Sequence, residues 1–210
     1  MKYGEFKDFV LQLINQFSAN GEELTARYND QEDYMVRIPH LLNAAMLDIS
    51  ANAQPLVSVM HPTAEEQEDL GNGWTRVTVP EDFMRMTEDG IPVIRDGIQT
   101  RLKAYYMVGD GKVDIRNDLM RHGILEYCRT PKRVATRGWS GTDGVQLDGS
   151  IEAQTAAAYY VASMLVMQDD AFAYAALRNE YDDKLSSMKK RLRAEVYQVA
   201  DVMGASYPYM

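Results

Sequence analysis

The sequence predicts an α+β fold, in which a helical bundle of about four helices carries a small antiparallel β-rich insertion between its helix pairs. Two observations lead to this fold class. Apolar residues recur at helical spacing near both ends of the chain, whereas the middle alternates with a period of two. We therefore expect residues 1–53 with 151–203 to form a helical core, residues 54–150 to form the β-rich insertion with mobile loops, and residues 204–210 to form a C-terminal arm.

Two helices are expected before the insertion. The first carries apolar residues on one face, and Asn20-Gly21 should end it: Phe6, Phe9, Val10, Leu13, Ile14 and Phe17. The second should run from near Asp33 to Ala51, and Pro39 within it predicts a helix start or a kink.

The middle of the chain predicts short antiparallel strands joined by tight turns. Residues 74–79 alternate from Trp74 onward, which indicates a strand, and further candidates follow at 92–95, 102–108, 112–116 and 123–129. Pro80 to Phe83 predicts a turn or a short helix. Two stretches predict loops, namely the polar, acidic residues 61–73 and the glycine-rich residues 138–150, of which the second should be mobile.

Two long helices are expected at the end. The segment from Ile151 to Met167 becomes apolar almost all round, which predicts burial between other helices. The last helix should end at Gly204, and its apolar residues step by four and three like a coiled-coil seam: Leu177, Tyr181, Leu185, Met188, Leu192, Val196, Val199 and Met203.

The charge and the cysteine content limit the function classes. The formal net charge is -9, so the surface should repel free nucleic acid, although such a surface suits the wall of a channel through which DNA slides. The single cysteine excludes an intramolecular disulfide. The first residues are not those of a signal peptide, and the most apolar run, 156–167, is too short to cross a bilayer, so we expect synthesis in the cytoplasm and no membrane contact.

The sequence offers no arrangement of residues that is typical of an enzyme. His40, His61 and His122 lack metal-ligand spacing, and residues 109–112 (GDGK) fit a hairpin turn better than a phosphate-binding loop. Cys128 has no base beside it and is expected to be a buried structural thiol. We therefore expect no catalytic residues, no metal site and no cofactor.

Four segments, taken in order, resemble a known family. Residues 34–45 (YMVRIPHLLNAA) combine a tyrosine, a proline and Asn-x-Ala, and residues 79–83 (VPEDF) follow an alternating strand. Residues 122–131 (HGILEYCRTP) are similar to a strand of the pattern G-x-aliphatic-x-Y-x-R-x-P, and residues 157–181 resemble a closing helical pair. Together they resemble the head–tail adaptor (connector ring) proteins of tailed bacteriophages over roughly residues 30–190.

This resemblance implies a structural virion protein of the head–tail neck. About a dozen copies would form a ring beneath the portal protein, extend the DNA channel and receive tail or nozzle proteins, while DNA passes through non-specifically. The resemblance implies neither catalysis nor a cofactor. The alternative is a helical binding or regulatory module that associates with protein or DNA, which the acidic charge and the β insertion both disfavour.

Three groups of residues are candidates for contacts in such a ring. The acidic stretch is expected to face the channel lumen: Glu65, Glu66, Glu68 and Asp69. A basic cluster and the aromatic C-terminal arm are expected to touch the portal or another partner: Lys189, Lys190, Arg191, Arg193, Tyr207, Pro208 and Tyr209. The basic cluster is also typical of a solvated helix face, and the arm could instead fold back on its own protomer or stay disordered.

Overall fold

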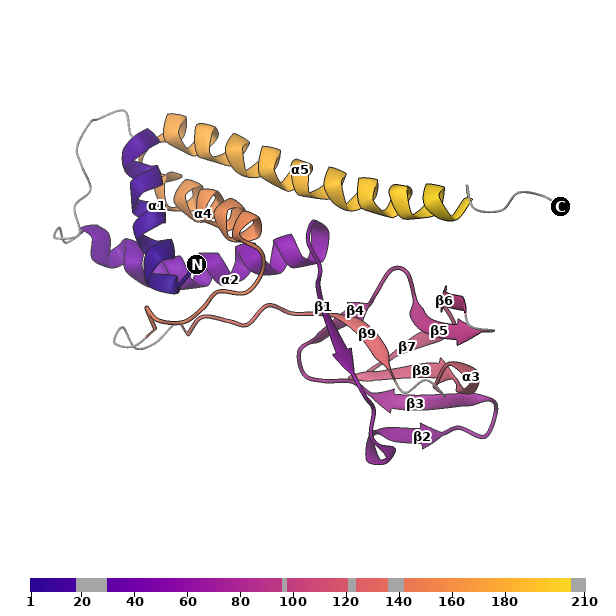
Figure 1. Ribbon diagram of the computed structural model, residues 1–210. Coiled ribbons are helices and arrows are strands. Elements are labelled where there is room, and N and C mark those ends of the chain that lie inside the picture. The colour runs from indigo at the N-terminus through magenta and orange to yellow at the C-terminus, as the bar shows by residue number, and fades with distance from the viewer. Residues whose placement is uncertain (18–29, 96–97, 121–123, 136–141, 205–210) are drawn as a thin grey trace. The chain divides into compact units, whose positions relative to one another are not determined.

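A computed structural model describes residues 1–17, 30–95, 98–120, 124–135 and 142–204 (Figure 1). Of residues 30–32, 94–95, 98–99 and 192–204, the backbone alone is described. The chain divides into two compact units. Met1–Gln54 with Pro131–Met210 is called the helical unit here, and Pro55–Thr130 is called the β unit.

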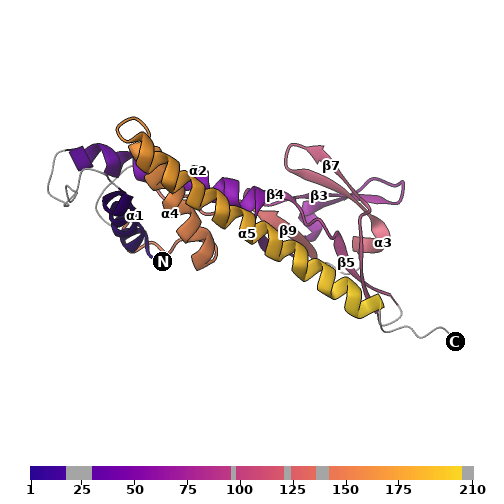
Figure 2. The same cartoon turned by 90° about the horizontal axis from the view of Figure 1, so that it is seen from above.

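In the part of the helical unit that the structure describes there are four helices: α1 (Tyr3–Phe17), α2 (Asp30–Asn52), α4 (Ile151–Val166) and α5 (Ala171–Gly204). Figures 1 and 2 show α4 lying alongside α5. Small side chains of α4 such as Ala157 and Ala158 are fully buried, which lets neighbouring helices approach closely. Larger side chains from the other helices complete this core: Phe6, Val10, Ile38, Leu42, Ile49, Leu177 and Tyr181.

Polar side chains set where the last two helices begin. The Ser150 hydroxyl accepts a hydrogen bond from the Ala153 N–H at 3.1 Å, and Asp170 accepts one from the Ala173 N–H at 2.9 Å. Each satisfies an N–H that the first helical turn leaves without a partner. Pro39, in contrast, lies inside α2.

The segment directly before α4 is held in place by the side-chain amide of a residue in α4. The buried Gln154 of α4 donates from Nε2 to the carbonyl oxygens of Leu147, Asp148 and Gly149 at 3.0–3.1 Å. Lys2 and Gln146 also form a β-bridge. In the described part of the predicted mobile loop, residues 142–150, these backbone groups therefore have defined partners, and the mobility of the segment stays a prediction.

The described residues of the β unit form three antiparallel sheets. The first has the order β1-β9-β4, the second the order β2-β3-β8-β7, and β5 pairs with β6 in the third. The strands are short: β1 (Leu56–Met60), β2 (Gln67–Asp69), β3 (Trp74–Thr78), β4 (Phe83–Met86), β5 (Ile91–Arg95), β6 (Ile98–Leu102), β7 (Tyr105–Gly109), β8 (Lys112–Arg116) and β9 (Leu125–Arg129). One turn of 3-10 helix, η1 (Ala64–Glu66), and a short helix, α3 (Asn117–Met120), complete the unit.

This unit has a hydrophobic core of its own. Period-two burial on β3 and β8 turns Val77, Val113 and Ile115 inward, where they are fully buried. Strands and helix from elsewhere in the unit add the rest of that core: Met86, Ile91, Val93, Leu119 and Leu125.

The predicted fold class is wrong. The chain is α+β, but it is not a bundle of about four helices with a small β-rich insertion. Its described residues form five α-helices and nine strands in three antiparallel sheets, so the β structure is a major unit with a separate core. That unit also ends at Thr130 and not at residue 150. Strands of three to five residues are too short for period two to reveal them all, so the sequence reading undercounted them.

Among the described residues, no helix has both the length and the apolar character that a bilayer crossing requires.

Candidate functional site

The acidic stretch does not form a simple loop. Glu65 and Glu66 belong to η1, and Glu68 belongs to β2, as does Asp69. All four side chains are exposed. Glu66 accepts hydrogen bonds from the Thr63 N–H at 2.7 Å and the Thr63 hydroxyl at 3.0 Å, and these bonds hold the pKa of its carboxyl below the ordinary value. The prediction of a loop over 61–73 is therefore wrong at η1 and β2.

The four-stranded sheet that contains β2 has a polar and aromatic outer face. Arg76 donates to both carboxylate oxygens of Asp114, at 2.7 and 3.0 Å, and lowers the pKa of that carboxyl. Trp74 packs against Tyr106 of β7 with the ring centroids 4.8 Å apart. This face joins β3, β8 and β7 by side-chain contacts as well as by the backbone ladder.

β7 forms the edge of this sheet and is unusually exposed for an apolar strand. Tyr106 is 64% exposed, Met107 53% and Val108 46%. Natural edge strands are commonly guarded by charges or proline because their outer N–H and C=O groups can pair with another chain. An apolar edge of this kind is a candidate for a protein interface.

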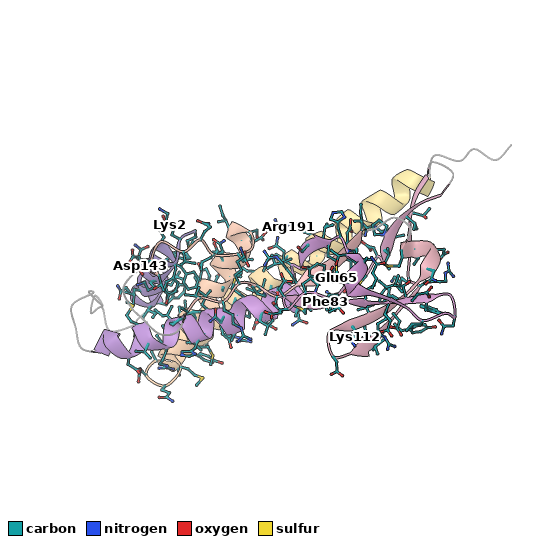
Figure 3. The ribbon with its side chains drawn as sticks, turned by 90° about the horizontal axis from the view of Figure 1, so that it is seen from below. Lys2, Glu65, Phe83, Lys112, Asp143 and Arg191 are labelled. Carbon is teal, nitrogen blue, oxygen red and sulfur yellow. The ribbon has the colours of Figure 1, made fainter. Side chains whose placement is uncertain are left out.

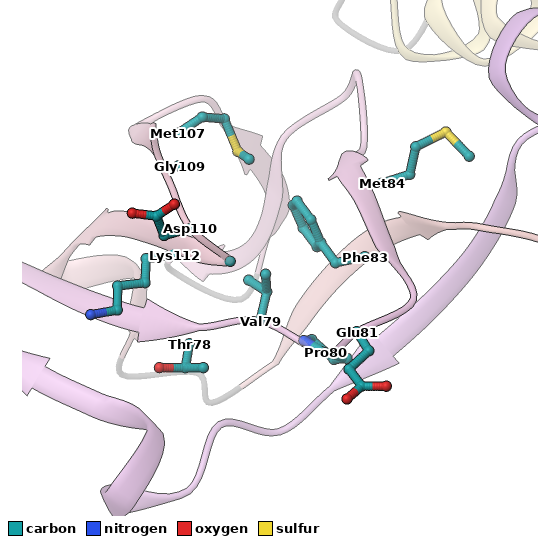
Figure 4. A pocket seen from close by; sticks show the side chains of 11 residues that line it. Thr78, Val79, Pro80, Glu81, Phe83, Met84, Met107, Gly109, Asp110 and Lys112 are labelled. Atoms are coloured by element: carbon teal, nitrogen blue, oxygen red, sulfur yellow. The ribbon is translucent and has the colours of Figure 1, made fainter.

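An open pocket of about 380 Å³ lies beside the β7–β8 hairpin (Figure 4). The Val79 N–H donates to the Gly111 carbonyl at 2.9 Å, which ties the end of β3 to the hairpin tip. Apolar side chains, among them Phe83 and Met107, line the pocket, while Lys112 belongs to its rim residues. The volume and the apolar lining of this pocket fall in the range of ligand-binding clefts.

Two segments that carry the family resemblance meet in the β unit. The Tyr127 hydroxyl donates to Asp82 Oδ1 at 2.9 Å, and the Thr130 N–H donates to the Asp82 carbonyl at 2.7 Å. The rings of Phe83 and Tyr127 stack with centroids 5.5 Å apart. Burial, the largest cause, and the bond to Asp82 raise the pKa of Tyr127, so it stays protonated and donates.

The other two segments meet in the helical unit. The Arg37 guanidinium donates to the Met164 carbonyl at 3.2 Å, which joins residues of both segments. Just beyond the first segment, Asp48 Oδ2 of α2 accepts a hydrogen bond from the Tyr181 hydroxyl of α5 at 2.6 Å. Burial raises the pKa of Tyr181 far above its ordinary value, and the bond to Asp48 raises it further. Both pairs of segments therefore connect different helices or strands through hydrogen bonds.

The predicted partner-contact residues are only partly described. Lys189 and Arg191 lie on α5, and the Arg191 guanidinium pairs with Glu152 of α4. This pairing neutralises part of the basic cluster. The side chain of Arg193 and the residues Tyr207, Pro208 and Tyr209 lie outside the described residues. Their contact with a partner stays a prediction.

The surroundings of the chemically reactive residues indicate structural roles. Cys128 is buried in β9, and burial raises the pKa of its thiol, as expected of a structural cysteine. Asp110 and Gly111 adopt positive φ in the turn between β7 and β8, so residues 109–112 form the hairpin that the sequence predicted. His122 lies outside the described residues. Within the described ranges, no three His, Cys, Asp or Glu side chains cluster in a way that could hold a metal ion.

Sequence comparison adds no relative. No protein-family model matches the chain, and no curated protein matches it significantly.

Proposed function

We propose that the chain is a structural virion protein, a head–tail adaptor of a tailed bacteriophage. About a dozen copies would form a ring beneath the portal in the virion neck, extend the DNA channel and receive the tail, after synthesis in the host cytoplasm. The chain would bind the portal, its own copies and tail or nozzle proteins.

The joint formed by Asp82, Tyr127 and Thr130 carries this proposal. Residues 79–83 and 122–131 are the two most patterned segments of the resemblance, and their named residues bond directly to each other. Likewise Arg37 and Met164, which belong to the other two segments, join α2 and α4. A head–tail adaptor acts through its shape. Motifs whose residues join helices or strands to each other are therefore the kind of motif that such a family requires.

Surface properties agree with a protein that assembles. The edge strand β7 exposes apolar side chains next to an apolar pocket, and the net charge of -9 disfavours tight binding to the DNA that passes. The pairing of Arg191 with Glu152 offsets one positive charge of the basic cluster, and the net charge of -9 disfavours the alternative of a DNA-associated regulatory module.

Electron microscopy of the purified chain mixed with its cognate portal protein tests the proposal. We expect a ring of density on one face of the portal, with one adaptor copy for each portal subunit. A folded chain that neither binds the portal nor forms a ring at micromolar concentration would contradict it. The portal alone, imaged in the same buffer, is the control.

A further inference from the structure

The sheet β2-β3-β8-β7 has two outer edges, β2 and β7, and the inner hydrogen bonds fix which backbone groups face outward. The Leu70 N–H donates to the Trp74 carbonyl, and the Arg116 N–H donates to the Ala104 carbonyl. Bonded and non-bonded pairs alternate along an antiparallel ladder. The outward N–H and C=O groups are therefore those of Gln67 and Asp69 on β2, and those of Tyr105 and Met107 on β7.

These two edges match in length. β2 has three residues, Gln67–Asp69. The β7–β8 register is regular from Tyr105 to Met107 and then shifts before Gly109. Each edge thus offers two outward-facing residues, spaced two apart, that an antiparallel partner can bond.

The two edges also match in the faces of their side chains. Gln67 pairs with the buried Val77, and Met107 pairs with the buried Val113, so Gln67 and Met107 point to the core side of the sheet. Glu68 and Tyr106 point to the outer side. Placing Gln67 of one copy opposite Met107 of another therefore continues both faces without a break.

Charge favours pairing of unlike edges. Around β2 the exposed side chains are acidic, including Glu65 and Asp69, whereas two exposed lysines and one exposed carboxylate flank β7, at Lys103 before it and at Asp110 and Lys112 after it, which leaves this edge net positive (Figure 3 labels Glu65 and Lys112). Antiparallel pairing brings the start of β2 toward the hairpin that holds Lys112, and brings Asp69 toward Lys103. Pairing of β2 with β2 would place like charges together, which costs free energy.

We propose that β7 of one copy pairs antiparallel with β2 of the next copy, so that this sheet continues from copy to copy around the ring. The inference rests on the proposed function, because it assigns the contact between ring subunits. Each copy supplies one edge of each kind, and a head-to-tail contact of this type closes into a ring when its rotation permits. The pairing covers Tyr106, Met107 and Val108.

Engineered disulfides test this pairing directly. In the proposed register Glu68 faces Tyr106 as a non-hydrogen-bonded pair, for which the Cα atoms lie about 4.5 Å apart, within the range of disulfides. The combination Glu68→Cys with Tyr106→Cys should give a ladder of covalent multimers on a non-reducing gel. Each single variant should give at most dimers, and the buried Cys128 should contribute little background.

A matched control and a second pair guard against artefacts. Val57 is an exposed residue on an edge strand of a different sheet, so Glu68→Cys with Val57→Cys should give no ladder. Because Tyr106→Cys removes the contact with Trp74, Gln67→Cys with Met107→Cys provides an independent test on the other face, with Cα atoms about 5.5 Å apart.

Charge reversal gives a non-covalent test of the same register. Glu65→Lys and Lys112→Glu should each weaken self-association about two- to fivefold, as sedimentation velocity measures it, because exposed pairs contribute little. The double variant should recover the wild-type value. If the double variant does not recover the self-association of wild type, Glu65 and Lys112 do not lie near each other in the assembly, and the proposed register is wrong.

The disulfide assay is run on portal-bound rings and on the free protein, which separates the two proposals. Rings on the portal without a covalent ladder would overturn the edge pairing and leave the adaptor function standing. A ladder from a chain that never binds the portal would support the pairing and overturn the adaptor function. Absence of a ladder in both samples would overturn the pairing.

Discussion

Asn43 binds the main chain of Val134 at two points. Its Nδ2 donates to the Val134 carbonyl at 2.9 Å, and its Oδ1 accepts from the Val134 N–H at 2.9 Å. These are the groups that a neighbouring strand would bond. An amide of α2 therefore takes the place of a strand for the buried, extended chain at Val134, which belongs to no sheet among the described residues.

Replacing Asn43 by alanine should lower the free energy of unfolding by about 2 kcal/mol, because it leaves a buried N–H and a buried C=O without partners. Urea unfolding followed by circular dichroism measures the loss. Asn52→Ala is the control, since the Asn52 amide donates to the exposed Asp48 side chain, and it should change stability by less than about 0.5 kcal/mol. Equal stability of the two variants would contradict the role of Asn43.

Asn43→Asp should make stability depend on pH. A carboxylate can accept from the Val134 N–H but repels the Val134 carbonyl, whereas a carboxylic acid can donate to it. The folded state then raises the pKa of this group above its ordinary value of about 3.9. The bond is fully present below about pH 4 and is lost as pH rises through the raised pKa. Unfolding curves at pH 4 and pH 7 should show a larger deficit, relative to wild type, at pH 7.

Stability should fall in alkaline solution because buried tyrosines must lose protons. Burial, with a contribution from Asp143, raises the pKa of Tyr3 to about 12, and burial with Asp48 raises that of Tyr181 well above the ordinary value. Both groups hold their protons more tightly when folded. Their stabilisation is therefore complete below about pH 10 and declines as pH rises through the raised pKa values.

Tyr181→Phe separates this effect from general alkaline unfolding. At pH 8 the free energy of unfolding of this variant should be about 2 kcal/mol lower than that of wild type, because a hydrogen bond to a carboxylate disappears. Between pH 9 and pH 11 the free energy of unfolding of the variant should then fall by less than that of wild type. Tyr106→Phe is the control, because Tyr106 is 64% exposed. A wild-type chain with constant stability up to pH 11 would contradict the burial argument.

Gly90 should tolerate no side chain. Its φ is +91°, and a Cβ atom there would lie 2.6 Å from the Leu102 carbonyl oxygen. Gly90→Ala should therefore lower the free energy of unfolding by about 3 kcal/mol or more. Gly71→Ala is a matched control, because Gly71 also has positive φ but its Cβ would meet nothing within 4 Å, and it should lose about 1 kcal/mol. Similar losses for both would indicate that φ alone matters.

Deleting residues 204–210 should abolish portal binding and leave the chain folded. The segment contains Tyr207 and Tyr209, which provide contact area, and Pro208, which favours an extended shape. Co-sedimentation with the portal and a melting curve are the two measurements. A truncated chain that still binds the portal would show that residues 204–210 are not needed for portal binding. A large drop in melting temperature would instead indicate that this segment folds back on its own protomer.

Local patterns predicted the elements that are long or strongly periodic. α1 was identified from its apolar face, and β3 from alternation that buries Thr75 and Val77. β2 was missed because Gln67–Asp69 contains no apolar residue, and β4 was missed because it begins directly after the turn at Pro80. These omissions made the β structure seem a small insertion.

Of the candidate surface, the sequence analysis singled out the acidic residues on and before β2, but neither the exposed edge of β7 nor the arrangement of the two edges. Glu68 and Tyr106 are far apart along the chain, and only the order of strands places them on the two outer edges of one sheet. Asn43 and Gln154 gave a weak signal, as polar residues within apolar helical stripes, and such residues need a partner that periodicity does not reveal.

The pairing of β1 with β9 has a consequence for how this chain could be rearranged. Leu56 lies opposite Arg129, so the first and last strands of the β unit close on each other within one ladder. Residues 55–130 therefore begin and end side by side, so that a short loop could replace them, and a loop of few residues costs little closure entropy. A short turn from Gln54 to Pro131 should yield a transplantable helical scaffold, and other hairpin-ended modules could be grafted at the same point.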